Sequence, residues 1–580
     1  MSSTISRRDF LKGATAGAAG VAALGLTGLG GATPVNAQEA AAPANAQEAA
    51  ASAPAASTPI PPLAPPGKWD MEADIVIVGA GGGGLSAAAL ATEKGNSVIV
   101  VDKLPVPGGG TQHSATFFCV AGGSRIQNEV KYALPGFPFN PDAAVEMFMP
   151  AYKWMDRALL RQLIVKGPEC IDWMETKGVP WEFDPHIMNM GLVWKGAVEG
   201  AFIPLGMKPV TDHMHGVAKD QGAQFIFKTS CQALVRDGAR IVGIKTVDLT
   251  GQESWIHAKK AVILTAGGFA MNRDMLKEYT PEVYLGAAAV FAMPCDTGEC
   301  TRMAQGAGAD MAGLGSYLTF DGGIDDYAQG TGPWHRYLYS GDNQLSRQPW
   351  LSIDIAGKRI PYQSTEPGTP TALSGLMGQA DVQMSQIGHR AYVIFDADYE
   401  THILKFNQSI CRMPILPDLP NVGRMSEYFG PHDWREGAKK GIARGGIKTS
   451  DTIEGLGKEL GFNPGVLTKA VKNWNAVCAT GEDPELNYDK RWLNPVVKPP
   501  FYGVRVGGQI ESTKAGVRVN PQMQVIDTKG EVIPGLYAGF HTAGGSMGTN
   551  SSAATPSVLG SVGLSWTGGY IAAENAVLEG

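Results

Sequence analysis

The sequence lacks the spaced cysteine pairs that hold metals, iron–sulfur clusters or covalently attached haem. None of its seven cysteines lies in a C-x-x-C or C-x-x-C-H motif. An odd count excludes a complete disulfide framework. Cys295 and Cys300 could bridge or bind a metal, but scattered core or loop thiols explain them more simply. We therefore predict no metal site. The seven positions are Cys119, Cys170, Cys231, Cys295, Cys300, Cys411 and Cys478.

Long runs of residues of one kind, basic or apolar, are also missing. The formal net charge is −7 and no long basic run occurs, which argues against a nucleic-acid partner. After the first 37 residues, no apolar run reaches the length needed to span a membrane. At 580 residues, the chain can hold two or more domains.

The first 37 residues have the pattern of a twin-arginine signal peptide. Residues 6–12 read Ser-Arg-Arg-Asp-Phe-Leu-Lys, a Gly/Ala-rich apolar stretch follows at 13–31, and Val35-Asn36-Ala37 is an A-x-A-like cleavage site. A chance Arg-Arg pair before a membrane anchor is the alternative, but the stretch is too rich in Gly and Ala to anchor well. We predict export to the periplasm or outer cell surface. Residues 38–67 are Ala/Pro-rich and are predicted to be a disordered linker.

A strand, a glycine turn and a helix follow the linker. Residues 74–78 are predicted to form a buried strand, and Gly79, Gly81 and Gly84 have the G-x-G-x-x-G spacing of a dinucleotide site. A second predicted strand at 97–101 ends at Asp102, close to the distance expected for a carboxylate that binds a ribose hydroxyl. Twin-arginine export carries folded proteins, so it suits a protein that binds its nucleotide before export.

Beyond this unit, the sequence pattern changes at about residue 273 and again after residue 498. We expect a helix at 160–178, and two strands at 224–227 and 241–247 around a turn. Residues 273–498 mix aromatics, prolines and polar loops, as an inserted second domain would. The last 80 residues return to alternating strands and glycine-rich turns.

At this point the chain resembles the FAD-dependent fumarate reductase and succinate dehydrogenase superfamily. It is most similar to the soluble branch with urocanate reductase and 3-ketosteroid Δ1-dehydrogenase. The resemblance implies a Rossmann-like α/β FAD-binding domain in two segments, 68–272 and 499–580, with an inserted α+β capping domain at 273–498. The motifs that carry it are the glycine triplet, Asp102-Lys103, 108–111, 265–269, 357–359, 500–502 and 533–538.

The resemblance also implies which residues contact the cofactor, FAD. One position departs from the family, because His541 stands where relatives carry an acid. His113 lies near the position where some relatives attach FAD covalently, though its register is shifted. The FAD-binding residues implied are Gly79, Ala80, Gly81, Gly83, Gly84, Asp102, Lys103, Gly109, Gly110, Thr111, Ala233, Ala266, Gly267, Gly268, His541, Ser557 and Val558.

Two further departures bear on the substrate. Pro367 occupies the position of the fumarate reductase catalytic arginine, and Ser551 that of the arginine that binds the substrate carboxylate. Proline cannot give a proton, and a dicarboxylate would lose its bidentate clamp. Fumarate and succinate are therefore not expected as substrates.

A flavin enzyme still needs a group that handles the proton. Tyr502 matches a position where ketosteroid dehydrogenases place a substrate-binding tyrosine, and Tyr362 lies in the loop of the fumarate reductase acid. We predict both as catalytic, with Tyr337, Tyr339 and Glu366 as lesser candidates. Packing at a domain interface is the alternative for each tyrosine.

These features predict an exported reductase of a C=C bond conjugated to a carbonyl, in a small organic substrate that is not a dicarboxylate. Electrons would come from a separate protein, such as a cytochrome, in a pathway of anaerobic respiration, because the chain carries no haem motif. One alternative is a dehydrogenase of a steroid-like or cyclic ketone. Another is a flavin electron carrier without turnover, which a capping domain argues against.

Overall fold

The structure is a computed structural model, and its described part holds two main sheets. It describes residues 57–114, 117–151, 154–184, 191–194, 206–290, 292–293, 295–324, 345–362, 372–406, 435, 439, 442–443, 445–548 and 559–579. No helix within these residues has the length and apolarity to cross a membrane.

The larger sheet contains the strand–glycine–helix unit. Its order is β18-β19-β9-β1-β2-β6, and the pairs β1/β2, β1/β9, β2/β6 and β9/β19 are parallel. Strand β2 and the second half of β1, residues 75–78, are buried and purely apolar, as parallel strands covered on both faces must be. The strands are β1 (Met71–Val78), β2 (Val98–Val101), β6 (Gln224–Ile226), β7 (Thr229–Asp237), β8 (Arg240–Asp248), β9 (Glu253–Leu264), β18 (Gln524–Ile526) and β19 (Val532–Ala538).

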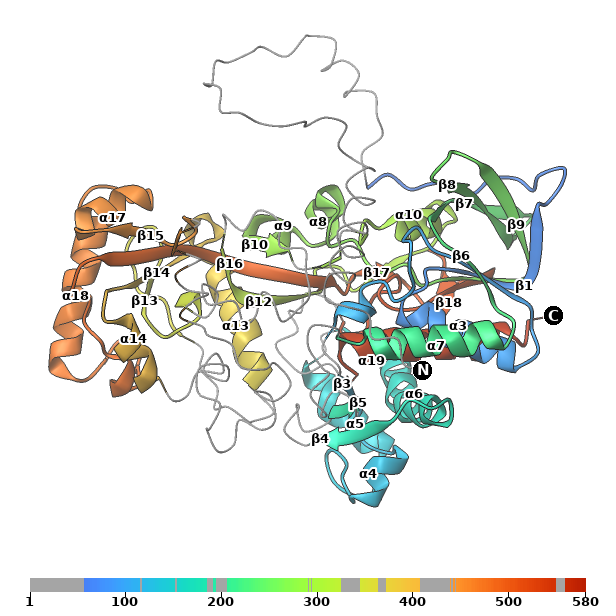
Figure 1. Cartoon of the computed structure of the whole chain (residues 1–580), viewed down its shortest axis with the longest axis horizontal. Helices are drawn as coiled ribbons and strands as arrows, with labels where there is room; N and C mark the ends of the chain where they lie inside the picture. Colours follow the sequence, from blue (N-terminus) through green and yellow to red (C-terminus); the bar gives the residue numbers. More distant parts are fainter. Residues whose placement is uncertain are drawn as a thin grey trace, which may run out of the picture. The chain divides into compact units, whose positions relative to one another are not determined.

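Helices α3, α7 and α19 lie along this sheet, and glycines allow α3 and α19 to pack closely (Figure 1). A Cβ on Gly569 would lie 1.8 Å from the carbonyl oxygen of Gly83. The Ser86 hydroxyl donates to the Trp566 carbonyl at 2.7 Å across the same interface. The helices of this part are α3 (Gly82–Glu93), α4 (Arg125–Glu129), α5 (Pro141–Phe148), α6 (Arg157–Thr176), α7 (Lys208–Asp220), α10 (Glu299–Gly306) and α19 (Gly560–Ala576).

The smaller sheet is built around the long strand β16, which pairs with β10, β12, β14 and β15. A separate apolar core, which includes Trp350, Phe395 and Trp474, packs beside it. Its strands are β10 (Ala287–Val290), β12 (Tyr317–Ile324), β13 (Leu351–Ile353), β14 (Ala391–Phe395), β15 (Lys448–Ser450) and β16 (Phe501–Thr513). Its helices are α8 (Arg273–Tyr279), α9 (Pro281–Gly286), α13 (Ala372–Met384), α14 (Tyr399–His402), α17 (Ile453–Glu459) and α18 (Val466–Thr480).

Two small sheets complete the fold. One is three-stranded, with β3 (Phe117–Cys119), β4 (Trp181–Asp184) and β5 (Gly191–Trp194). The other pairs β11 (Met311–Ala312) with β17 (Gly516–Val517). The architecture is thus an α/β domain with a second, α+β domain built on the smaller sheet, as the predicted fold class requires.

Three local expectations differ from the structure. Strand β16 lies in the segment expected to return to the FAD-binding domain, yet it pairs with the strands of the smaller sheet. The hairpin turn at Asp237 joins β7 to β8, while β6 is a separate strand beside β2. The sequence does not predict β7 because its buried and exposed residues do not alternate regularly. The helix expected at 160–178 is α6, which begins three residues earlier.

Candidate active site

The glycine turn after β1 is required by close backbone packing. Gly79 has φ +104°, and a Cβ there would lie 2.6 Å from the Thr265 carbonyl oxygen. A Cβ on Gly84 would lie 1.8 Å from the Gly79 carbonyl oxygen. Both distances are far below van der Waals contact, so these two glycines are needed by the protein itself.

Gly81 differs from its neighbours because its missing side chain faces open space. The nearest atom to a Cβ there is the Thr111 hydroxyl, 3.9 Å away, and Gly81 lines a cavity. Its φ of −73° is open to any residue. The side of Gly81 that faces the cavity is therefore open, and a pyrophosphate would approach the start of α3 from this side.

The cavity has a volume of about 390 Å³. Its wall is formed by the loops after β1, β2 and β9, the end of β16 and the start of α19. Most of the predicted FAD-binding residues line it: Gly79, Gly81, Asp102, Lys103, Gly109, Gly110, Thr111, Ala266, Gly267, Gly268 and His541.

Four of the predicted FAD-binding residues lie behind the cavity wall, next to residues that line it. Gly84 packs against Gly79, and a Cβ on Gly83 would lie 3.0 Å from the Ser565 carbonyl oxygen of α19. The Ala80 N–H donates to Asp102, and Ala233 follows the cavity-lining residues 229–232 on β7. Ser557 and Val558 lie outside the described residues.

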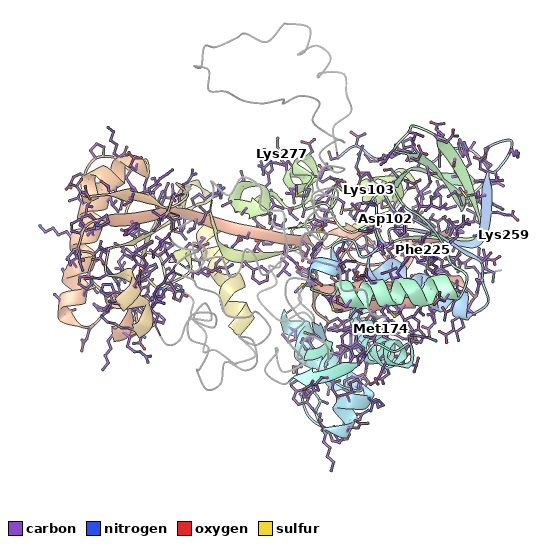
Figure 2. All side chains as sticks on the ribbon, viewed as in Figure 1. Asp102, Lys103, Met174, Phe225, Lys259 and Lys277 are labelled. Atoms are coloured by element: carbon purple, nitrogen blue, oxygen red, sulfur yellow. The ribbon has the colours of Figure 1, made fainter. Side chains whose placement is uncertain are left out.

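Asp102 and Lys103 lie together at the end of β2 (Figure 2). Asp102 accepts from the Ala80 N–H at 2.6 Å and from the Leu104 N–H at 2.7 Å. Burial raises the pKa of Asp102, although these two hydrogen bonds oppose the shift. Lys103 donates to Thr297 at 2.8 Å and to Glu299 at 3.0 Å, so its charge is already paired.

A buried carboxyl that sequence reasoning missed lines the same cavity. Asp296 lies beside Gly267, where a Cβ would be 2.5 Å from its Oδ1. Burial raises the pKa of Asp296 to about 7, so near neutral pH this side chain exists in both protonation states. Its position in the polar run 295–299, directly before α10, is the only sequence signal that pointed to it.

A second polar group, also missed, joins β16 to α19 and His541. The buried Lys514 ammonium donates to the Ser561 hydroxyl at 2.6 Å and lies 3.4 Å from His541 Nε2. The Ser561 hydroxyl donates to Glu511 at 3.2 Å. Glu511, Ser561 and His541 line the cavity, whereas Lys514 lies behind them. Glu511 near the end of β16 and Lys514 directly after it, two charged residues close together, were the available signal.

The structure separates the two predicted catalytic tyrosines from the cavity. Tyr502 stacks on Phe395 at 5.3 Å in the core of the smaller sheet. Nine residues of β16 separate it from Glu511, or about 30 Å at 3.3 Å per residue. The Tyr362 hydroxyl donates to the Arg347 carbonyl at 2.7 Å, and its ring meets Trp492 edge-on. Both tyrosines thus pack against the core of the smaller sheet, as the packing alternative describes.

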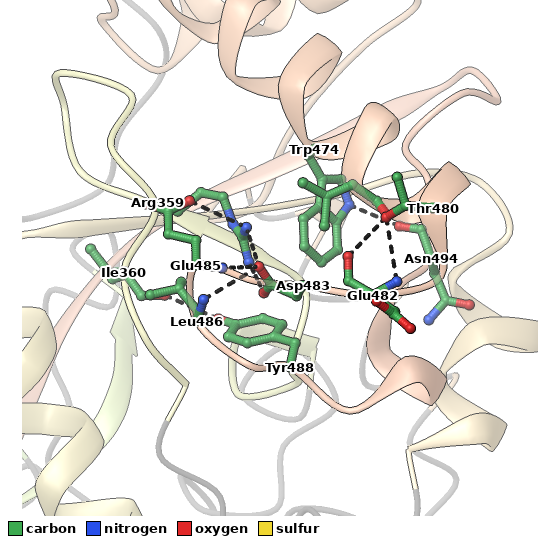
Figure 3. Close-up of polar contacts among 11 residues, drawn as sticks. Arg359, Ile360, Trp474, Thr480, Glu482, Asp483, Glu485, Leu486, Tyr488 and Asn494 are labelled. Carbon is green, nitrogen blue, oxygen red and sulfur yellow. Dashed lines mark hydrogen bonds and ion pairs between the residues drawn. The ribbon is translucent and has the colours of Figure 1, made fainter.

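Arg359, in the family motif at 357–359, also belongs to the smaller sheet (Figure 3). It pairs with Asp483 at 3.0 and 2.5 Å, and its guanidinium lies 4.9 Å from the Trp474 ring centre and 5.2 Å from that of Tyr488. These contacts join α18 to the segment after β13. The motif is therefore structural in this chain.

His113 and three cysteines complete the wall. Burial and nearby Lys208 lower the pKa of His113, which keeps this imidazole neutral. Cys231, Cys295 and Cys300 are free thiols. Burial raises the pKa of Cys231 to about 12, so it is not a thiolate at neutral pH. In the described part of the chain, no group of His, Cys, Asp and Glu side chains could hold a metal ion.

Two features of the cavity fit FAD. Gly81 leaves its cavity side open beside the start of α3. His541 Nδ1 is buried without a hydrogen-bond partner among the described residues, as expected for a group whose partner is a cofactor.

Comparisons with known proteins agree that the chain binds FAD. The sequence profile of the family described as "FAD binding domain" matches residues 74–556, so the chain belongs to this family. The profile of the TAT (twin-arginine translocation) pathway signal sequence matches residues 4–25. The chain is thus an exported FAD-dependent oxidoreductase.

Relatives with assigned activities cover most of the chain. It is 28% identical to urocanate reductase of Eggerthella lenta, over 84% of this chain and 72% of that protein. It is 25% identical to vinyl phenol reductase of Lactiplantibacillus plantarum, over 82% and 90%. The structure of a 3-ketosteroid-Δ4-(5α)-dehydrogenase from Rhodococcus jostii has the same fold, with a TM-score of 0.59 and 21% identity over 90% of this chain and 100% of that one.

Export can be tested on the signal itself. Replacing Arg7 and Arg8 together by lysine removes the pair that the twin-arginine machinery reads. We expect the unprocessed precursor to stay in the cytoplasm, measured by fractionation and immunoblotting. Lys12→Arg, outside the pair, is the control and should be exported as the wild type is. Export of the double variant at the wild-type level would contradict the twin-arginine route.

Proposed function

We propose that the enzyme reduces a C=C bond conjugated to a carbonyl in an organic substrate that is not a dicarboxylate. FAD supplies hydride chemistry at its N5 when bound. The protein binds and orients the two partners and excludes water. The relatives named for urocanate and vinyl phenol reduction support reduction of a conjugated double bond.

The distribution of positive charge around the cavity carries the proposal. Among the described residues that line it, the lysines and arginines are Lys103 and Arg302. Lys103 is paired with Glu299, and Arg302 Nε donates to the Thr58 carbonyl at 2.7 Å. At the end formed by β16 and α19, the charged wall residue is Glu511. Pro367 and Ser551 stand in the sequence where the family carries the two arginines that act on a dicarboxylate, so we expect this chain to bind a dianionic substrate poorly.

The electron donor is proposed to be a separate protein. No C-x-x-C-H haem motif occurs in the sequence, which supports electron delivery by another protein. The export signal supports an encounter beyond the cytoplasmic membrane.

Anaerobic reoxidation of the photoreduced protein tests the proposal. Fumarate, urocanate, cinnamates and enone steroids are added singly while flavin absorbance is followed, and the saturated analogue of each compound is the control. We expect fast reoxidation by at least one conjugated substrate and none by fumarate. Fast reoxidation by fumarate would contradict the argument from Pro367 and Ser551. Reduction of the oxidised flavin by a saturated ketone would favour the dehydrogenase direction.

A further inference from the structure

A buried ammonium behind the cavity wall contacts two side chains that line the cavity. Lys514 is 1% exposed, and the partners of its Nζ are the Ser561 hydroxyl and His541 Nε2. Both partners line the cavity, and Lys514 itself does not. Lys514 has no part in the reduction proposed for this enzyme.

The chemistry of Lys514 fixes the proton on the His541 ring. An ammonium has donors and no acceptor, so the Nε2 that faces it at 3.4 Å must accept. In a neutral imidazole, the other nitrogen then carries the hydrogen. Burial and the Lys514 charge both lower the pKa of His541 well below its usual value, so the ring is neutral. Nδ1 is therefore an N–H donor.

This donor has no partner among the described residues, and its atom is buried. A buried N–H without an acceptor is costly, and such groups in native proteins usually bind something else. His541 lies on the wall of the cavity whose glycine cradle fits FAD.

We propose that His541 is a fixed hydrogen-bond donor to bound FAD through Nδ1, and that Lys514 is the positioning residue that holds it in this tautomer. The inference rests on FAD occupying the cavity, and it does not depend on which substrate is reduced. An ionised acid at position 541, as in the relatives the chain resembles, could only accept a hydrogen bond. This chain thus offers the cofactor a contact of the opposite polarity.

Three substitutions at position 541 distinguish the loss of the hydrogen-bond donor from a change in side-chain volume. An asparagine amide can place an N–H near the Nδ1 position, glutamine reaches toward Nε2, and aspartate is an acceptor only. We expect His541→Asn to bind FAD within about threefold of the wild type, and His541→Gln and His541→Asp to bind about tenfold more weakly. The full-length apoproteins are titrated with FAD, and circular dichroism confirms that each is folded. Equal affinities for the three variants would overturn the proposal.

A double-mutant cycle tests the part played by Lys514. Lys514→Met removes the ammonium at similar volume, and we expect it to weaken FAD binding about as much as His541→Gln does. The two losses should not add in the double variant, because both remove the same donor. Additive losses would show that Lys514 acts on FAD independently of His541, and would overturn the positioning role.

The tautomer itself is read by nitrogen NMR of histidine-labelled apoprotein. The His541 signals are those that disappear in His541→Asn. We expect the proton on Nδ1 in the wild type and a loss of this preference in Lys514→Met. A proton on Nε2 in the wild type would overturn the proposal. Neither this readout nor FAD affinity involves a substrate, so their failure is distinguishable from failure of the proposed reductase activity.

Discussion

Replacing Gly84 by alanine is expected to disrupt the FAD-binding domain, whereas replacing Gly81 by alanine should leave the apoprotein intact and weaken FAD binding. A Cβ added at Gly84 would lie 1.8 Å from the Gly79 carbonyl oxygen, so the turn between β1 and α3 has to open. Overpacking of this kind costs about 3 kcal/mol or more, since the blocking atom is backbone. The free energy of unfolding, from urea titration of the apoprotein, measures this loss.

Gly81→Ala is the matched variant, since no atom lies closer than 3.9 Å to its Cβ and its φ of −73° is open to alanine. Its free energy of unfolding should stay within about 1 kcal/mol of the wild type, because alanine also reduces the entropy of the unfolded chain. The new methyl group occupies the cavity side where the pyrophosphate approaches. FAD affinity should therefore fall at least about tenfold, which is about 1.4 kcal/mol. Unchanged affinity would place the pyrophosphate elsewhere.

Gly81 and Gly84 belong to the part of the site that local sequence can predict. Gly79, Gly81, Gly84 and Asp102 lie in one strand–turn–helix–strand unit, and their spacing reflects contacts within that unit. The parallel strands and the cofactor end of the sheet follow from it. The twin-arginine pattern is likewise contained in a few adjacent residues.

The remainder of the site is assembled from distant segments. The polar group behind the wall joins β16, α19 and the loop after β19, so no local pattern announces it. Tyr502 shows the opposite problem. Its Pro-Phe-Tyr motif matches a functional position in the family, but β16 is 13 residues long and carries that end into the core of the smaller sheet. A motif fixes the residue type, while the register of a long strand decides which end reaches the cofactor.

Lys514→Met should stabilise the apoprotein at pH 7 even though it weakens FAD binding. Burial lowers the pKa of Lys514 from 10.5 to about 8, so keeping the ammonium charged inside the fold costs about 3 kcal/mol. Methionine of similar volume removes that cost. A higher free energy of unfolding together with a lower FAD affinity would mark Lys514 as a residue kept for the cofactor and not for the fold.

The pH dependence of the free energy of unfolding tests the lowered pKa of Lys514. An unfolded lysine keeps its proton to about pH 10.4, whereas folded Lys514 loses it above about pH 8. Between these values the unfolded chain binds more protons, so wild-type stability should rise with pH across this window relative to Lys514→Met. Lys259→Met is the control, because Lys259 is exposed, pairs with Glu72 and has a raised pKa. Urea titrations at pH 7 and pH 9.5 measure the difference. Equal pH dependence in the wild type and Lys514→Met would mean that folded Lys514 keeps its proton to pH 9.5, as the unfolded lysine does, and would contradict the lowered pKa. A full-slope rise that begins already at pH 7 would mean that the buried amine is neutral there, and the fixed His541 tautomer would then lose its cause.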